Sequence, residues 1–314
     1  MMDGRLQVFA GNSHPQLASE IMKSLEAPLG RAVIGEWKNG ETRVKLDENV
    51  RGSDVFVIQS ICNPVNHHLM ELLLIIDALR RASADRITAV IPYYGYAKQE
   101  KKTSGREPIS AKLVANLIVT AGAHRVLTLD LHAPAIEGFF DIPVDHLRAT
   151  PLLARRFKQI SDAQDVVAVS PDAGGVARAD DFRTRIAAPL AIISKRHPEA
   201  DATEVLEMVG DVDGKTAIIV DDMISTGGTL VEGAKLLKAR GASDVIAAAT
   251  HGIFASNALD LIEDSPISKV YITDSIPLPN GWQSKPVELV SIAPLLAEAI
   301  MRIHKDLSVS ALFH

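Results

Sequence analysis

The sequence predicts an α/β protein built from two duplicated, doubly wound domains with parallel sheets. Two observations lead to this fold class. Short β-branched runs, typical of buried parallel strands, alternate with segments of helical periodicity. The same order of elements also occurs twice: a strand at 54–59, a helix at 68–81 and a strand at 86–91 correspond to a strand at 216–220, a helix at 229–240 and a strand at 245–249. This repetition indicates duplication of one domain.

Four more apolar strands are predicted, at 125–129, 166–169, 190–193 and 269–273. The boundary between the halves is predicted near 147–151, which gives one domain at 1–147 and another at 148–288. The remaining residues, 289–314, include a segment at 291–304 whose apolar residues recur at helical spacing.

Length and composition bound the kind of protein. A chain of 314 residues and 33.8 kDa is long enough for about two domain cores. The net charge of −6 and the pI near 5.9 argue against a general nucleic-acid or anionic-membrane surface. Cys62 is the single cysteine, and the start of the sequence shows no apolar signal core. We therefore expect a cytoplasmic protein without nucleic-acid or membrane partners.

The stretch 216–229, TAIIVDDMISTGGT, is the most informative part of the chain. Asp221 and Asp222 follow an apolar strand, at the end where open α/β sheets bind ligands. Next comes a hydroxyl-rich glycine turn consisting of Ser225, Thr226, Gly227, Gly228 and Thr229. Its N–H groups, its hydroxyls and the positive end of the following helix favour a phosphate. The two carboxylates do not, so we expect them to bind sugar hydroxyls or a metal ion.

A simpler interpretation of the same stretch is a tight strand-to-helix turn in which Ser and Thr cap the helix. Two adjacent carboxylates at one strand end argue against this interpretation. The sequence therefore predicts a site for a phosphorylated sugar in the second half of the chain.

This stretch resembles the motif that binds 5-phosphoribosyl 1-diphosphate (PRPP) in type I phosphoribosyltransferases and in ribose-phosphate pyrophosphokinases. A length of 314 residues in two similar halves fits the second family. The resemblance continues through FAGNSHPQLA, NVRGSDVFVIQS, LMELLLIIDALRRASADRITAVIPYYGYAKQEKK, GREPISAKLVA, LTLDLHAPAIEGFFDIPVDHL, SPDAGGVAR and SVSALFH. It implies two domains of type I phosphoribosyltransferase-like fold, with 289–314 returning to the first domain.

The resemblance also implies a reaction, in which the pyrophosphoryl group of ATP is transferred to the 1-hydroxyl of ribose 5-phosphate, giving PRPP and AMP. The 5-phosphate is then expected in the loop 225–229, and the ribose hydroxyls against Asp221 and Asp222. Ser225 stands where bacterial members of the family often carry Asp, and its hydroxyl can still donate to phosphate or ribose.

The family places a catalytic Lys, followed two positions later by an Arg, next to this site. Lys195 matches the Lys, but His197 stands at the second position and Arg196 lies one residue early. Lys195 and Arg196 are the expected catalytic residues, and His197 is an expected ribose 5-phosphate contact. The polar stretch 198–204 is expected to form a mobile flap.

His132 and Asp172 are the predicted metal ligands. Each follows an apolar strand, and an imidazole with a carboxylate can hold Mg²⁺ that is otherwise coordinated by water and substrate phosphates. Without the resemblance, each residue would be interpreted as a helix cap or as a polar core residue. The resemblance implies that both bind Mg²⁺ and that His132 also contacts ATP.

The resemblance implies further ATP contacts from the first domain. Lys98 and Gln99 lie in a polar loop that would otherwise be interpreted as a solvated charge run. Trp37, Asn39 and Glu41 match a motif that reaches the adenine of ATP bound largely by a neighbouring subunit, although Trp37 alone would be explained as a half-buried aromatic residue. A lone subunit would then have an incomplete site, so we expect a homo-oligomer, a hexamer by resemblance.

At Glu137 the sequence departs from the family, whose members commonly read QIQ where this chain has AIE. In the family the second glutamine lies in a site that binds inorganic phosphate or ADP. An ionised Glu repels an anion and offers no donor, so weak dependence on inorganic phosphate is expected. The alternative is that Glu137 pairs with a Lys or Arg of another subunit.

Two other functions stay open on the sequence alone. A phosphoribosyltransferase would share the sugar-phosphate loop but would consume PRPP, and the combination of His132, Asp172 and Lys195 argues against it. A catalytically silent paralogue that assembles with active synthetases would fit the altered segment 195–197, because a fold does not guarantee chemistry.

Overall fold

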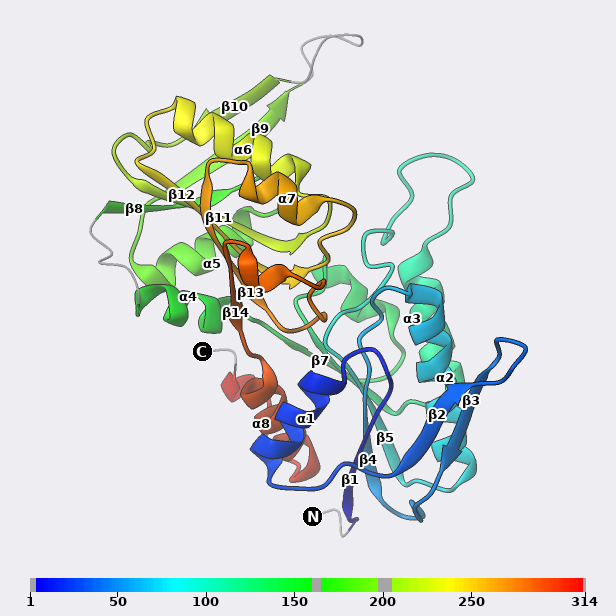
Figure 1. Cartoon of the computed structure of the whole chain (residues 1–314). Helices are drawn as coiled ribbons and strands as arrows, with labels where there is room; N and C mark the ends of the chain where they lie inside the picture. Colours follow the sequence, from blue (N-terminus) through cyan, green and yellow to red (C-terminus); the bar gives the residue numbers. More distant parts are fainter. Residues whose placement is uncertain (1–3, 160–164, 197–204, 313–314) are drawn as a thin grey trace. The chain divides into compact units, whose positions relative to one another are not determined.

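The computed structural model describes residues 4–159, 165–196 and 205–312. The chain divides into two compact units (Figure 1). Unit 1 contains the chain up to Arg148, Ser275–Pro277 and the chain from Ile292 onward. Unit 2 contains Ala149–Asp274 and Leu278–Ser291.

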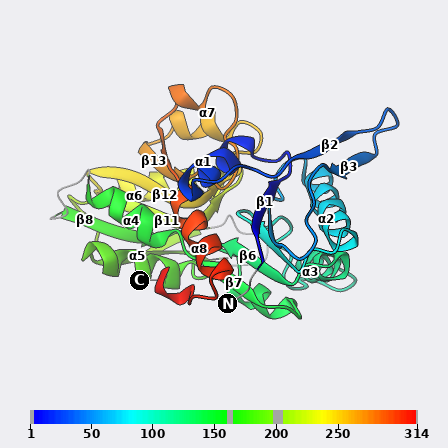
Figure 2. The same ribbon diagram turned by 90° about the horizontal axis from the view of Figure 1, so that it is seen from below.

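Unit 1 is built on a five-stranded parallel sheet in the order β1-β4-β5-β6-β7. Its strands are β1 (Leu6–Ala10), β4 (Asp54–Ile58), β5 (Arg86–Ile91), β6 (Arg125–Leu129) and β7 (Val144–Leu147). Its helical segments are α1 (Pro15–Leu25), α2 (Val65–Arg81), α3 (Ser110–Ala121), α8 (Ala293–His304) and the 3-10 turns η1 (Pro134–Phe139) and η4 (Ser310–Leu312). Both views show α1 beside α8 on one face of the sheet, with α2 and α3 on the other (Figure 1 and Figure 2).

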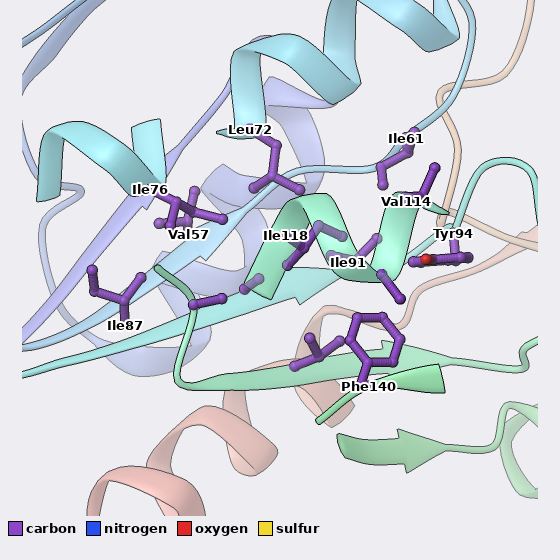
Figure 3. Packing of buried hydrophobic residues seen from close by; sticks show 14 of the residues in the cluster. Val57, Ile61, Leu72, Ile76, Ile87, Ile91, Tyr94, Val114, Ile118 and Phe140 are labelled. Carbon is purple, nitrogen blue, oxygen red and sulfur yellow. The ribbon is translucent and has the colours of Figure 1, made fainter. Parts of the chain in front are cut away.

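An apolar cluster fills the space between this sheet and the helices α2 and α3. In Figure 3 the side chains that meet there are Val57, Leu72, Ile76, Ile87, Ile91, Val114 and Ile118. Tyr94 and Phe140 join the cluster with their ring centroids 5.8 Å apart in an edge-to-face arrangement, and the hydroxyl of Tyr94 donates to the carbonyl of Ala111. Each fully buried side chain of this size stabilises the fold by about 1.5–3 kcal/mol.

The helix α8 is tied to the sheet of unit 1 at Asp54, the first residue of β4. Asp54 is 1% exposed, and Arg86 donates to its two oxygens from Nε at 2.8 Å and from Nη2 at 2.7 Å. His304, the last residue of α8, places Nδ1 2.8 Å from the same carboxylate, and Arg86 Nη2 donates to the carbonyl of Ile303. A buried carboxylate requires such partners, so this cluster fixes α8 on unit 1.

The strands β2 (Ala32–Glu36) and β3 (Thr42–Leu46) form a separate antiparallel hairpin that projects from unit 1 in both views (Figure 1 and Figure 2). Because the hairpin leaves the main sheet, β1 is an edge strand. The chain before the hairpin covers part of that edge, where Gly30 N donates to Val8 O at 2.7 Å. A Cβ on Gly30 would lie 2.6 Å from the ring of Phe9, so this close approach requires glycine.

Unit 2 is built on a seven-stranded sheet in the order β10-β9-β8-β11-β12-β13-β14. Its strands are β8 (Val166–Ser170), β9 (Leu190–Arg196), β10 (Val205–Val209), β11 (Thr216–Ile224), β12 (Asp244–Gly252), β13 (Ile267–Thr273) and β14 (Val287–Val290). Its helices are α4 (Thr150–Lys158), α5 (Val176–Ile186), α6 (Gly228–Ala239) and α7 (Ala258–Glu263). Among these described strands, β10 alone runs antiparallel to its neighbour.

The two units repeat one order of elements, and the predicted fold class is confirmed. β1 corresponds to β8, the hairpin β2–β3 to β9–β10, and β4 to β11, with α2, β5, β6 and β7 corresponding to α6, β12, β13 and β14. The main difference is the hairpin, which joins the sheet in unit 2 and leaves it in unit 1.

Among the strands of unit 2 that run further than the sequence predicts, two show the cause clearly. The strand predicted at 216–220 continues to Ile224, because its last residues still pair with β12 after β8 has ended at Ser170. The strand predicted at 190–193 continues to Arg196, because it pairs with β10. Partner strands, which lie elsewhere in the sequence, therefore set both lengths.

Leu72→Ala should lower the free energy of unfolding by about 2–5 kcal/mol, because it removes a fully buried side chain and leaves a cavity between α2 and the sheet. Leu29→Ala is the control, since Leu29 is 40% exposed and should change stability by less than about 1 kcal/mol. Denaturant unfolding of both variants measures the difference. Equal effects would contradict the assigned core.

Candidate active site

The carboxyl ends of β9, β8 and β11 lie next to one another at one edge of the unit 2 sheet. Asp172 follows β8 by two residues, and Asp221 and Asp222 lie in the part of β11 that extends past β8. Lys195 lies near the end of β9, where its backbone pairs with Leu206. The order of strands reverses between β8 and β11, and open α/β sheets bind ligands at such a point. The sheet thus brings groups from three separate segments to one edge.

An arginine holds the two carboxylates of β11. Arg178, near the start of α5, places Nη1 3.2 Å from Asp221 Oδ1 and 3.6 Å from Asp222 Oδ1. Asp222 is buried, and its backbone N–H donates to Asp221 Oδ1 at 2.8 Å. One guanidinium therefore faces two carboxyl groups in a largely desolvated place, where full ionisation of both is costly.

The electrostatics of this pair favour a proton on it. Burial raises the pKa of Asp221 to about 7, and the side-chain hydrogen bond and the charge of Asp222 act in the same direction, whereas the positive charge of Arg178 and the backbone N–H of Asp222 oppose them. A carboxyl pair that retains a proton can both donate and accept hydrogen bonds. This property suits sugar hydroxyls, which also do both.

The loop after β11 leads directly into a helix. Gly227 has a φ of 79°, a left-handed conformation that favours glycine, and α6 begins at the next residue. No side chain caps the helix at Gly227, which argues against a turn built around Ser and Thr caps. Thr226 and Thr229 are exposed and Ser225 is half-buried. The arrangement offers hydroxyls and the positive end of α6 to an anion.

The two predicted metal ligands belong to different units and are described separately. In unit 2, Asp172 is exposed, its Oδ1 accepts from Gly175 N at 2.8 Å, and its carbonyl accepts from Ser170 Oγ at 2.7 Å. In unit 1, His132 is half-buried three residues after the end of β6. Among the described residues, no group of three His, Cys, Asp or Glu side chains is arranged to hold a metal ion by itself.

The segment that carries the predicted catalytic cations is described in part. Lys195 and Arg196 are the last residues of β9, and their backbones pair with Leu206 and Val205 of β10. His197 and the expected flap at 198–204 lie outside the described residues. The hairpin formed by β9 and β10 has the same place in the order of elements as the β2–β3 hairpin of unit 1.

The predicted adenine-contacting residues lie at the tip of the β2–β3 hairpin. Trp37 is 52% exposed, with the guanidinium carbon of Arg43 4.7 Å from its ring centroid. Glu41 N donates to Asn39 Oδ1 at 3.3 Å, and both side chains are exposed. These three residues do not contribute to a core, so the tip is free to serve recognition.

Lys98 and Gln99 are exposed in the loop between β5 and α3. Gln99 also has a local structural role, because Ser110 Oγ donates to its Oε1 and Ala111 N donates to its carbonyl at 3.3 Å. Its expected contact with ATP stays a prediction.

The matching place in unit 1 is filled by a buried glutamate. The strands β1 and β4, which correspond to β8 and β11, lead into Asn12 and Gln59. Glu71 of α2 is 0% exposed and accepts from Asn12 N at 2.6 Å, Asn12 Nδ2 at 2.8 Å and Gln59 Nε2 at 2.7 Å. The strand ends of unit 1 are therefore engaged with the protein's own carboxylate, whereas the loop predicted to bind the sugar phosphate lies in unit 2.

Glu137 pairs within its own chain. Its carboxylate accepts from His146 Nδ1 and lies 3.9 Å from Arg148 Nη2. A pocket of about 510 Å³ is lined here by Glu137, His146 and Arg148 together with Asp145 and Ser308. Asp145 is paired with Arg125, with Nη1 2.6 Å from Oδ2, and Glu137 lies against Arg148, so the cations at this pocket already have carboxylate partners, which disfavours a multiply charged anion. Weak dependence on inorganic phosphate stays a prediction.

Sequence reasoning did not single out Arg178 as a functional residue. It lies in SPDAGGVAR, where two glycines lead into the helix that brings it close to the end of β11. Its place in this glycine-containing segment was the feature of the sequence that could have indicated a functional role. Its contacts with Asp221 and Asp222 depend on two strands and a helix meeting in space, which the local sequence does not reveal.

The fold and the site define a class. Duplicated α/β units, with paired carboxylates beside a glycine-rich helix start at the point of strand-order reversal, are typical of a phosphoribosyltransferase-like protein. In the described part of the chain, none of the helices has the length and apolar character needed to cross a lipid bilayer.

Comparison with known proteins gives the family. Residues 6–122 match the N-terminal domain of ribose phosphate pyrophosphokinase, and residues 195–314 match the phosphoribosyl synthetase-associated domain. The chain is 54% identical to the ribose-phosphate pyrophosphokinase of Caldanaerobacter subterraneus over 98% of both chains, and 50% identical to that of Oceanobacillus iheyensis over 99% of this chain and 98% of the other. The crystal structure of phosphoribosylpyrophosphate synthetase from Mycobacterium smegmatis matches with a TM-score of 0.92 and 44% identity, covering 96% of this chain and 99% of that one. The chain belongs to the ribose-phosphate pyrophosphokinase family.

Asp221→Asn should change how the stability of the ligand-free protein depends on pH. The folded carboxyl keeps its proton up to about pH 7, whereas the unfolded carboxyl loses it near 3.8. Between these values the folded state binds more protons than the unfolded state, so Asp221 makes the free energy of unfolding fall as pH rises from about 4 to about 7. Asp221→Asn should remove this contribution, as measured by denaturation at several pH values.

Asp211→Asn is the control for this measurement. A hydrogen bond from Lys215 lowers the pKa of the exposed Asp211. The contribution of Asp211 to the free energy of unfolding is therefore present at neutral pH and is lost only in acid. The difference in the free energy of unfolding between Asp211→Asn and the parent should therefore stay constant from about pH 5 to about pH 7. A flat difference for Asp221→Asn as well would show that the Asp221 carboxyl titrates normally.

Proposed function

We propose that the protein is a ribose-phosphate diphosphokinase, which transfers the pyrophosphoryl group of ATP to the 1-hydroxyl of ribose 5-phosphate and releases PRPP and AMP. The observation that carries this proposal is the pair Asp221 and Asp222 beside the start of α6, at the switch point of the unit 2 sheet. Family membership supports the same reaction. Neither a PRPP-consuming transferase nor a silent paralogue gains support from these findings.

Ribose 5-phosphate binds at β11 and the loop after it. The 5-phosphate accepts hydrogen bonds from the loop 225–229, where the positive end of α6 also favours its charge. The ribose hydroxyls meet Asp221 and Asp222, which Arg178 keeps oriented in the absence of substrate. His197 is proposed as a further contact with this substrate.

His132 and Asp172 are the residues that would hold Mg²⁺. Mg²⁺ is commonly bound by one or two protein groups together with substrate phosphates, so an imidazole and a carboxylate suit this ion. The exposed carboxylate of Asp172 suits this role, because only Oδ1 has a hydrogen bond from the loop described above. When bound, Mg²⁺ would neutralise charge on the phosphates of ATP.

ATP contacts come from His132, from Lys98 and Gln99, and from Trp37, Asn39 and Glu41 at the hairpin tip. The exposed tip would complete the ATP site of a neighbouring subunit, which makes the active form a homo-oligomer, a hexamer by family resemblance. The enzyme is proposed to work in the cytoplasm, in the supply of PRPP for nucleotide synthesis.

The reaction needs no covalent intermediate with the protein. The anomeric hydroxyl oxygen forms a bond to the β-phosphorus of ATP, the bond from that phosphorus to the bridging α–β oxygen breaks, and AMP leaves with this oxygen while the hydroxyl proton passes to solvent. Positioning and charge neutralisation dominate such a transfer. Lys195 and Arg196 are proposed to supply positive charge to the phosphoryl oxygens.

The direct test incubates the purified protein with ATP, Mg²⁺ and ribose 5-phosphate and follows AMP and PRPP by phosphorus NMR. Equal amounts of the two products are expected, and AMP should not form when ribose 5-phosphate is omitted. Repeating the assay over a dilution series beside analytical ultracentrifugation tests the assembly. A fully active monomer would contradict the shared ATP site, and ATP left intact would contradict the reaction.

Lys195→Ala should lower turnover by about 100-fold or more, as expected for loss of a preorganised transition-state charge. Lys215→Ala is the matched control, because Lys215 pairs with Asp211 just before the start of β11, at the opposite end of the strand from the site. The control should retain parental turnover. Comparable turnover in Lys195→Ala and the parent would remove Lys195 from the mechanism.

A further inference from the structure

The segment 130–132, which carries His132, is held by the neighbouring strand β7. Asp130 N donates to Leu147 O at 3.0 Å, and Leu131 N donates to His146 Nε2 at 2.7 Å. His146 and Leu147 are the last two residues of β7, and both are buried. The backbone directly before His132 is therefore fixed by a side chain as well as by the sheet.

The conformation of this segment requires support. Asp130 has a φ of 36°, in the left-handed region that residues other than glycine adopt at a cost in free energy. Such a conformation persists only where the surroundings impose it. Asp130 is 5% exposed, and Arg148 Nη1 lies 3.8 Å from its Oδ1. Contacts from β7 and the residue after it thus stabilise a turn that would otherwise relax.

The hydrogen bonds of His146 define its tautomer. Its Nε2 accepts from the N–H of Leu131 and lies 2.6 Å from Nη1 of Arg148, so this nitrogen carries no hydrogen. The hydrogen is then on Nδ1, which donates to the carboxylate of Glu137. Burial and the charge of Arg148 lower the pKa of His146, while Glu137 and Asp130 act in the opposite direction. The neutral ring is the form that can accept from Leu131.

We propose that His146 is a positioning residue for the reaction, acting through the N–H of Leu131 to hold His132 in place. The inference rests on the proposed function, because it takes His132 as a ligand of the metal and ATP. Glu137 contributes by holding the hydrogen of His146 on Nδ1. Loss of a group that hydrogen-bonds directly to a metal ligand commonly lowers metal affinity or activity by about 10- to 100-fold, and His146 acts one residue away, through Leu131, so we expect an effect near the lower end of this range.

A second histidine of unit 1 provides a matched control. His124 Nδ1 accepts from Ile87 N at 3.0 Å, which is the same kind of ring-to-backbone hydrogen bond. It lies at the beginning of β5 and β6, the edge of the sheet opposite to His132. Removing the His124 ring should alter only its own surroundings.

Hydrogen exchange at the Leu131 amide tests the geometry without any substrate. His146→Leu should speed exchange there by about 5-fold or more, because it removes one hydrogen bond. In His146→Gln the amide oxygen can accept from the same N–H, so exchange should stay close to that of the parent. His124→Leu should leave Leu131 unchanged. Equal exchange at Leu131 in the parent and in His146→Leu would overturn the inference.

Kinetics provide the second readout. His146→Leu should raise the KM for ATP with Mg²⁺, or lower turnover, by about 10-fold or more, and His146→Gln should restore most of the loss. The KM for ribose 5-phosphate should not change, because that site lies in unit 2. A fully active His146→Leu beside an inactive His132→Ala would overturn the inference and leave the proposed function intact. An inactive parent protein would refute the proposed function and, with it, the role assigned to His146.

Discussion

The structure depends on one constraint, which is that parallel strands place their carboxyl ends at the same edge of a sheet. In unit 2 the chain leaves β8, builds β9 and β10 on one side, and returns to build β11 on the other. Asp172, Lys195 and Asp221 reach one place because of this order. β11 also extends beyond the end of β8, and in this extension it pairs with β12 only. The positions of the two carboxylates there therefore depend on β12 and on Arg178.

The two copies of the domain use this edge in different ways. In unit 1 the strand ends meet Glu71, whose oxygens accept hydrogen bonds from Asn12 and Gln59, so the edge contributes to stability. In unit 2 the carboxylates lie on the strand itself, and a partly exposed guanidinium is their partner. Carboxylates therefore lie at this edge in both copies, on the helix α2 in the first and on the strand β11 in the second.

The sequence predicted what depends on local pattern and on resemblance. The strands at 86–91 and 125–129 agree with the structure because their apolar runs end where their pairing ends. The length of β11 could not be predicted, because β12 sets it. Arg178 and His146 were missed for a related reason: each acts on residues brought close only by the order of strands in its own sheet, and neither stands out from its neighbours in type or spacing.

The departure of the β2–β3 hairpin from the sheet has a consequence for the behaviour of the protein in solution. It leaves β1 at the edge of the sheet, and open strand edges are templates for aggregation. The hydrogen bond from Gly30 to Val8 covers part of that edge, and the bare Cα of Gly30 lets the chain pass over Phe9. A side chain at Gly30 would push this segment away from Phe9, and more of the edge of β1 would then be open to another strand.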